Sequence, residues 1–313
     1  MRTLLAILLL GLPSAGAAAW LPRPAPSPLN EPRRLYEAGN YPGVISYLTP
    51  AAMQKLRAEE LKLAYYYLGG SYERTGRLGE ALGVYQLAVK LFPGDASLLT
   101  KLAALLEEAD LEEEALPLYE KVLQLQPGNA QAHLGLAEID RSLGLLDRSA
   151  EHYEKSLETL GGQAGVWRDY AEVLLAQRDA RTAELAVRRA LELSPEADSW
   201  IDLAFIERAQ GRLGEALADL EKAAAKAPLR PGIRLARALW LLESGKSREA
   251  SAAAEEILAD SPDEPLAHWV RGMVLLKAGR REAAAKDFQA SAAAAREAPF
   301  MSRVSAALLE RLK

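Results

Sequence analysis

Similar residues recur about every 34 positions through most of this chain, and no other feature restricts its fold as strongly. A small residue recurs with steps of 34, 34, 34, 33, 34 and 34, at Ala81, Ala115, Ser149, Ala183, Ala216, Ala250 and Ala284. Four residues after each lies a large or apolar residue, at Tyr85, Tyr119, Tyr153, Val187, Leu220, Ala254 and Phe288. Both columns share the single 33-residue step, so they belong to one repeating unit. The period therefore predicts an array of stacked copies.

Each copy is predicted to consist of two helices. Ala and Leu are abundant after residue 60, and both residues favour helices because they lose little side-chain freedom there. A glycine recurs in the middle of the unit, at Gly76, Gly144, Gly211, Gly245 and Gly279. A proline recurs at its end, at Pro93, Pro127, Pro195, Pro228 and Pro262. Glycine permits the positive φ that often ends a helix, and proline stops the second helix.

This pattern resembles the tetratricopeptide-repeat (TPR) family, whose signature is W-x2-L-G-x2-Y…A-x3-F…P over 34 residues. The best match runs from Tyr65 to Pro93, as Tyr65-x2-Leu68-Gly69-x2-Tyr72…Ala81-x3-Tyr85…Pro93. Trp167 and Trp200 stand in the tryptophan column of later repeats, whereas Asp140 and Glu207 replace the tyrosine of the first helix. The resemblance implies an all-α, right-handed TPR α-solenoid built from antiparallel helix pairs.

The repeat register divides the chain into segments. About seven TPR repeats are expected over residues 62–298, preceded by a degenerate N-terminal repeat over 33–61 that contains Gly39, Val44 and Leu48. A C-terminal capping helix is expected over 299–313, because Phe300, Val304, Leu308 and Leu312 would share one helical face. Such ends are needed because one repeat buries too little surface to fold alone.

The N-terminus has the pattern of a secretory signal peptide over residues 1–19. Arg2 precedes the apolar run Leu4–Leu12, and small residues that suit a signal peptidase follow. An uncleaved membrane anchor is the alternative, although the run is about half of the roughly 20 residues that span a bilayer. Residues 20–32 hold five prolines between 22 and 32 and are expected to form a linker.

We therefore expect an exported protein, in a bacterial periplasm, with no membrane span after signal cleavage. The chain contains no cysteine, so it cannot carry a lipoprotein anchor, a disulfide or a thiolate metal site. The net charge of -5 argues against nucleic acid as a main partner.

Little in the sequence indicates an enzyme, and we expect no catalytic residues, no metal site and no cofactor. The three histidines, His133, His152 and His268, match no metal-ligand spacing. Gly245-Lys246-Ser247 resembles the end of a phosphate-binding loop, but Trp240 stands where that loop needs a glycine and a helix is expected before it. Once the repeats are assigned, no segment remains for a catalytic domain.

Acidic residues gather in one part of the array. Residues 96–163 contain 13 acids against 5 Lys and Arg. Six of the acids surround an expected turn between helices, at Glu107, Glu108, Asp110, Glu112, Glu113 and Glu114. They form either a solvated turn that stabilises the next helix dipole or a docking site for a basic partner.

The resemblance also implies a concave groove, where TPR ligands usually contact the fifth, ninth and twelfth residues of each repeat. In the last three repeats these positions become largely apolar: Ile201 and Phe205, then Leu235, Leu239 and Leu242, then Trp269, Met273 and Leu276. If solvent-facing, they would form a larger apolar patch than soluble monomers normally expose. The groove could hold a partner's helix or extended peptide, it could hold the chain's own C-terminal helix, or superhelical curvature could bury these residues.

The sequence thus predicts a non-catalytic scaffold or adaptor in the cell envelope that binds a protein or peptide partner in this groove. A structural or chaperone-like holding module without one fixed partner is the alternative. The sequence does not identify the partner.

Overall fold

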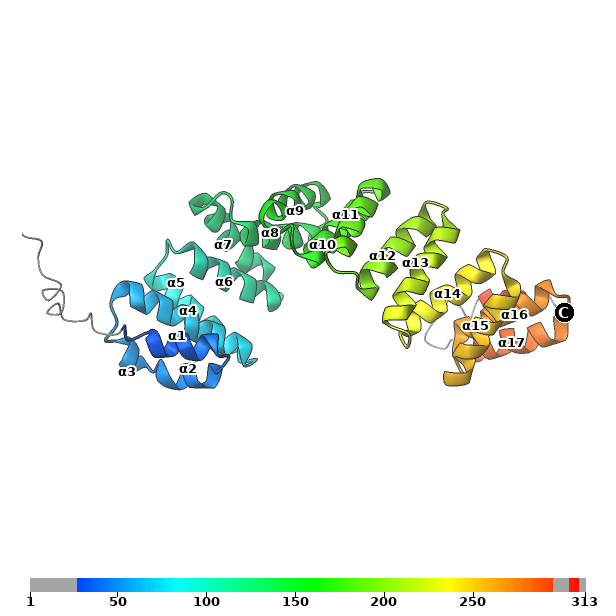
Figure 1. Ribbon diagram of the computed structural model, residues 1–313, viewed down its shortest axis with the longest axis horizontal. Coiled ribbons are helices and arrows are strands. Elements are labelled where there is room, and N and C mark those ends of the chain that lie inside the picture. Colours follow the sequence, from blue (N-terminus) through cyan, green and yellow to red (C-terminus); the bar gives the residue numbers. More distant parts are fainter. Residues whose placement is uncertain (1–26, 295–303, 310–313) are drawn as a thin grey trace, which may run out of the picture. The chain divides into compact units, whose positions relative to one another are not determined.

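The computed structural model of the chain describes residues 27–294 and 304–309, and every regular element in these ranges is an α-helix (Figure 1). The first helices are α1 (Asn30–Glu37), α2 (Tyr41–Tyr47) and α3 (Pro50–Met53). Helix pairs then follow in chain order: α4 (Ala58–Arg74) and α5 (Leu78–Leu91); α6 (Ala96–Glu108) and α7 (Glu112–Leu125); α8 (Ala130–Ser142) and α9 (Leu146–Leu160); α10 (Ala164–Ala176) and α11 (Ala180–Leu193); α12 (Ala197–Ala209) and α13 (Leu213–Lys226); α14 (Pro231–Glu243) and α15 (Ser247–Asp260); α16 (Pro265–Lys277) and α17 (Arg281–Ala294). The all-α class is confirmed.

Two compact units make up the chain, one up to Leu105 and the other from Leu106 onward. In the first unit, α1 and α2 are joined at Gly39, whose φ is 72°, and Val44 of α2 is fully buried. The short helix α3 fills the extra residues before α4. The ring centroids of Tyr36 in α1 and Tyr67 in α4 lie 5.2 Å apart, and α2 also contacts α4. Helices α1 and α2 therefore pack against α4.

The core of each pair is made by the two columns that define the period. Every member of the small column, from Ala81 to Ala284, is fully buried, and the large or apolar residue four positions later is at most 2% exposed. The rings pack onto places without side chains: a Cβ added at Gly272 would lie 2.7 Å from the Phe288 ring. This is close packing of a small surface against a large one, which explains why the two columns repeat together.

The turn between the two helices of a pair uses a left-handed residue in each of seven repeats. Five of these residues are the predicted glycines, with φ between 71° and 82°. Asp110 and Arg178 occupy the same column with φ of 57° and 68°. A residue other than glycine adopts this backbone conformation at a cost in free energy. The turn therefore holds the backbone of Asp110 and Arg178 in a strained conformation.

The single 33-residue step lies in a junction and leaves the helices unchanged. Helix α11 ends at Leu193 and α12 begins at Ala197, so three residues join them. Four residues join α13 to α14, and four join α15 to α16. The missing residue therefore shortens a connection and preserves the register of α11 and α12.

At the other end of the array, residues 304–309 form a helix. Ser305 is buried, and its hydroxyl lies 3.0 Å from the hydroxyl of Ser291 in α17. Val304 and Leu308 are partly buried. This helix therefore contacts α17, the second helix of the last pair. Phe300, Leu312, the signal peptide and most of the proline-rich segment lie outside the described residues.

Candidate functional site: the first-helix face

Ion pairs mark one side of the first helices in the second unit. Arg141 of α8 pairs with Glu172 of α10 at 3.2 Å, and Arg168 of α10 pairs with Asp202 of α12 at 2.7 Å. Arg208 of α12 continues the series by pairing with Glu243 of α14 at 3.0 Å. Each pair joins first helices of neighbouring repeats. The side on which these ion pairs lie is called here the first-helix face.

The predicted groove residues come from three consecutive first helices, α12, α14 and α16. They occupy two equivalent columns: Ile201, Leu235 and Trp269 form one, and Phe205, Leu239 and Met273 form the other. Phe205 is 49% exposed, and the other five are partly exposed while they pack against the core formed by α12 to α16. The helices therefore bring these two columns to one continuous, partly solvated apolar surface.

Two predicted residues behave differently from those columns. Leu276 is partly exposed but is not part of that core cluster. Leu242 is only 5% exposed, so it does not contribute to that partly solvated surface. It lies in the core with Trp240 and Leu241, because α16 packs against α14 on that side.

Aromatic and cationic contacts hold Phe205 in place. Its ring meets the edge of the buried Trp240 ring with centroids 5.1 Å apart. The Arg208 guanidinium lies 5.6 Å from the centroid of the same Trp240 ring. Such a T-shaped pair restricts the Phe205 ring while one of its faces stays in solvent. Phe205 is thus a rigid apolar anchor rather than a loose surface side chain.

Acidic side chains occupy the first-helix face of α6, α8 and α10. Burial raises the pKa of Glu107 to about 7, the nearby Glu138 adds to this effect, and the Tyr119 hydroxyl, which donates to Glu107 at 2.7 Å, opposes it. Burial also raises the pKa of Asp169, with further contributions from Glu138 and Glu172. These carboxylates therefore repel one another at close range.

The acidic turn predicted around Asp110 is divided between two environments. Glu112, Glu113 and Glu114 form the first turn of α7, where carboxylates interact favourably with the helix dipole. Glu107 instead lies in the last turn of α6 and accepts a hydrogen bond from Tyr119. Only the first group fits the solvated-turn interpretation.

The tryptophan column has a structural role that the sequence analysis missed. Its ring nitrogens contact the carbonyl oxygen six residues earlier, at the end of the preceding repeat. The three cases are His133 to Pro127 at 2.9 Å, Trp167 to Gly161 at 3.0 Å and His268 to Pro262 at 2.8 Å. This bond ties a first helix to the junction before it, and the fixed six-residue spacing was a usable signal.

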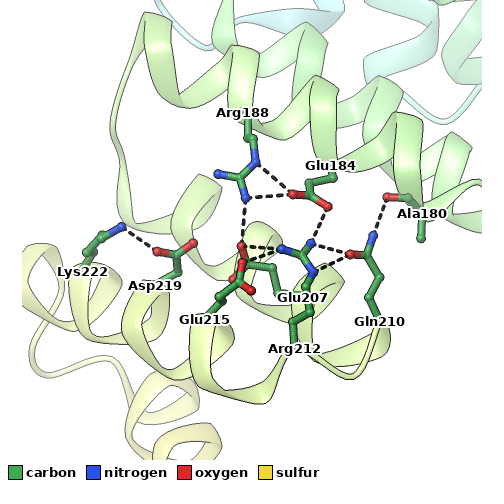
Figure 2. A network of polar contacts seen from close by, with 9 residues as sticks. All are labelled: Ala180, Glu184, Arg188, Glu207, Gln210, Arg212, Glu215, Asp219 and Lys222. Atoms are coloured by element: carbon green, nitrogen blue, oxygen red, sulfur yellow. Dashed lines mark hydrogen bonds and ion pairs between the residues drawn. The ribbon is translucent and has the colours of Figure 1, made fainter.

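An ionic network around the buried Glu207 connects α11, α12 and α13 (Figure 2). Glu207, which replaces the first-helix tyrosine, is 1% exposed and lies 3.0 Å from Arg188 and 3.6 Å from Arg212. Glu184 also contacts both arginines. Burial raises the pKa of Glu207 to about 7, Asp219 adds to the effect, and the arginines oppose it. The network links the second helix of one repeat to both helices of the next.

Other elements of the described chain give no sign of chemistry. Lys246 precedes α15 in a turn between helices, where Gly245 has a φ of 79°. No group of three or more His, Asp or Glu side chains in the described residues could hold a metal ion. In the same residues, no helix combines the length and apolar character needed to cross a membrane.

Comparisons with known proteins agree with this architecture. Family models described as tetratricopeptide repeats match residues 63–105, 104–164, 169–231 and 235–300. No curated protein matches the sequence.

Solved structures resemble the fold at low sequence identity. The TPR protein YrrB, whose structure is described as having an unusual peptide-binding site, is 20% identical with a TM-score of 0.53, and the match covers 58% of this chain and 95% of YrrB. PilF of Pseudomonas aeruginosa is 15% identical with a TM-score of 0.57, covering 67% and 96%. A TPR protein of Parabacteroides merdae is 19% identical with a TM-score of 0.53, covering 80% and 98%. Since the family models match well over half of its residues and the described helices form TPR pairs, the chain belongs to the tetratricopeptide-repeat family.

Proposed function

We propose that this chain is a non-catalytic scaffold of the cell envelope that binds a segment of a partner protein along α12, α14 and α16. One observation carries the proposal: Phe205, Leu239 and Met273 occupy the same position in three neighbouring first helices and remain partly exposed. A solvated apolar surface that continues over several elements is typical of a protein-binding site. Parallel first helices offer a surface on which a partner helix or extended peptide can lie.

The arrangement of the titratable groups also favours a scaffold over an enzyme. The acids and histidines with strongly shifted pKa values, Glu107, Glu207 and His152, belong to separate contacts between helices. Catalytic acids and bases would be expected to converge on one cavity. In this chain the three lie apart, in contacts of α6 with α7, of α8 with α9 and of α12 with α11.

Site-specific crosslinking tests the binding site. A photo-crosslinking residue at Leu239 is expected to attach one discrete partner in cells that produce the protein, and Phe205→Glu is expected to remove that product. Leu185 of α11 provides the control position, because it is 63% exposed and apolar but lies on a second helix. Identical products from Leu239 and Leu185 would contradict the proposed site.

A holding module without a fixed partner remains the second candidate function, because the apolar surface by itself sets no sequence requirement on its occupant. The same crosslinking experiment separates the two. A broad set of attached proteins from Leu239, absent at Leu185, would favour the holding module over the scaffold.

The envelope location rests on residues 1–19 and on the absence of cysteine. N-terminal sequencing of the protein from the periplasmic fraction is expected to show a mature chain starting at Ala18 or Trp20. A chain that starts at Met1 in the membrane fraction would contradict export as a cleaved protein.

A further inference from the structure

One repeat position changes character along the second unit. In consecutive first helices from α8 to α16, the ninth residue is Glu138, Glu172, Phe205, Leu239 and Met273. The first two are carboxylates and the last three are apolar. Because these positions are equivalent, the acids continue the same first-helix face on which the apolar columns lie.

The acidic end of this face has a local excess of negative charge. Glu138 lies close enough to Glu107 and Asp169 to raise the pKa of each, and none of these three side chains forms an ion pair in the described part of the chain. Glu172 pairs with Arg141, and Arg168 is engaged by Asp202. The nearby arginines therefore already have partners, and three half-buried carboxylates are left to repel one another.

A cationic side chain placed among these carboxylates would relieve that repulsion. The interaction would be stronger than at an open surface, because the three acids are half-buried and water screens them less. Apolar side chains placed on Phe205, Leu239 and Met273 would at the same time remove apolar surface from water. The two ends of the face thus select different halves of one ligand.

We propose that the segment bound on the first-helix face is a polypeptide with two halves, a basic half that contacts Glu138 and Asp169 and an apolar half that contacts Phe205, Leu239 and Met273. This inference rests on the proposed scaffold function and specifies its partner. Neighbouring helices pack about 10 Å apart, so the face from α8 to α16 is about 40 Å long and about 12 extended residues cover it. An acidic segment would meet the repulsion of Glu138 and Asp169, and a uniformly polar one would leave the apolar columns uncovered.

Synthetic peptides test this chemistry with the purified full chain. The probe is a fluorescent peptide of about 14 residues, with Lys and Arg in one half and Leu and Phe in the other. A second peptide replaces each Lys and Arg by Glu. Fluorescence anisotropy measures both affinities. The basic peptide is expected to bind at least about tenfold more tightly than the acidic one, and less tightly as salt rises.

Two sets of variants locate the contacts. Glu138→Gln with Asp169→Asn removes the charges at nearly constant shape and is expected to weaken the basic peptide about tenfold. Glu151→Gln with Glu158→Gln is the matched control, because both residues are exposed acids of α9, and the affinity is expected to stay unchanged. Phe205→Ser with Leu239→Ser tests the apolar half, and the far-UV helical signal shows whether each variant folds.

The outcomes distinguish this inference from the function on which it rests. If the apolar variant loses the peptide while the Glu138 and Asp169 variant keeps its affinity and the acidic peptide binds as tightly as the basic one, the scaffold stands and the basic partner is wrong. If neither set of folded variants changes the affinity, the first-helix face is not the binding site and both proposals fall. Loss of binding in both sets, but not in the α9 control, supports both.

Discussion

The Nδ1 atoms of His133 and His152 lie 2.9 Å apart, one on α8 and the other on α9. A carbonyl oxygen can only accept, so His133 donates from Nε2 to Pro127, and its Nδ1 must accept from His152 while the ring is neutral. The pKa of His152 is lowered to about 4, mainly by burial and also by the neighbouring His133. The contact therefore needs at least one neutral ring, because two protonated imidazoles would bring two N–H donors together.

This pair predicts that stability is lost in mild acid. The folded-state pKa of His152 lies below its ordinary value of 6.5, so its contribution is complete above pH 6.5 and falls as the pH drops toward 4. Glutamine does not titrate. Between pH 7 and pH 5, the free energy of unfolding of His152→Gln should therefore fall by up to about 2 kcal/mol less than that of the original chain. Urea unfolding at both pH values measures the difference. Equal losses would contradict the assignment.

Glu207 predicts the opposite slope in a different range. Its pKa is raised to about 7, so its contribution is complete below about pH 4.5 and is lost as the pH rises through 7. Arg188, Arg212, Glu184, Glu215 and Asp219 surround it and remain in the variant. Glu207→Gln should therefore show a smaller fall in the free energy of unfolding between pH 5 and pH 8. The check is the same urea titration, and an unchanged fall would mean that Glu207 is ionised throughout.

Gly272 should tolerate no side chain. A Cβ there would lie 2.7 Å from Phe288, whose ring is fully buried, so Gly272→Ala is expected to destabilise the protein by about 1–3 kcal/mol. Gly83→Ala is the control, because it is helical with no atom within 4 Å, and it should stabilise by up to about 1 kcal/mol. Thermal unfolding reports both signs, and a stabilising Gly272→Ala would show that the ring can move away.

Arg178 occupies a turn position that suits glycine. Its φ is 68°, so Arg178→Gly should relieve strain and stabilise the protein by about 0.5–1 kcal/mol. Ala218→Gly, at an exposed position inside α13, should destabilise by about 1 kcal/mol. Opposite shifts of the melting temperature in these two variants would confirm that the backbone conformation at each position decides the effect of a glycine. Shifts of the same sign would contradict it.

The sequence was sufficient for the fold because its strongest columns are those that pack. Ala81 and Tyr85, like their counterparts, are repeated and fully buried, so period and burial carry the same information. The turn column was incomplete in the sequence, since Asp110 and Arg178 adopt the glycine conformation without being glycine. Side-chain type alone does not reveal such positions.

The candidate site was less predictable, because it depends on how neighbouring helices are rotated. Leu242 and Leu276 hold equivalent positions, but α16 covers the first and the second stays partly exposed. Asp140 and Glu207 were visible as departures from a tyrosine column. Their arginine partners, Arg148 and Arg188, lie on other helices and could not be assigned from spacing.

The junction between α11 and α12 has one residue fewer than those after α13 and α15, and the helices on both sides keep their buried columns. The one-residue difference is therefore accommodated at a junction, while α11 and α12 keep their register. The junction Ser194–Glu196 is therefore the place at which an engineer could test the insertion of a protease site or a fluorophore between two repeats. The same freedom lets an array of this kind gain or lose whole repeats by recombination, with each new boundary falling where the chain already varies.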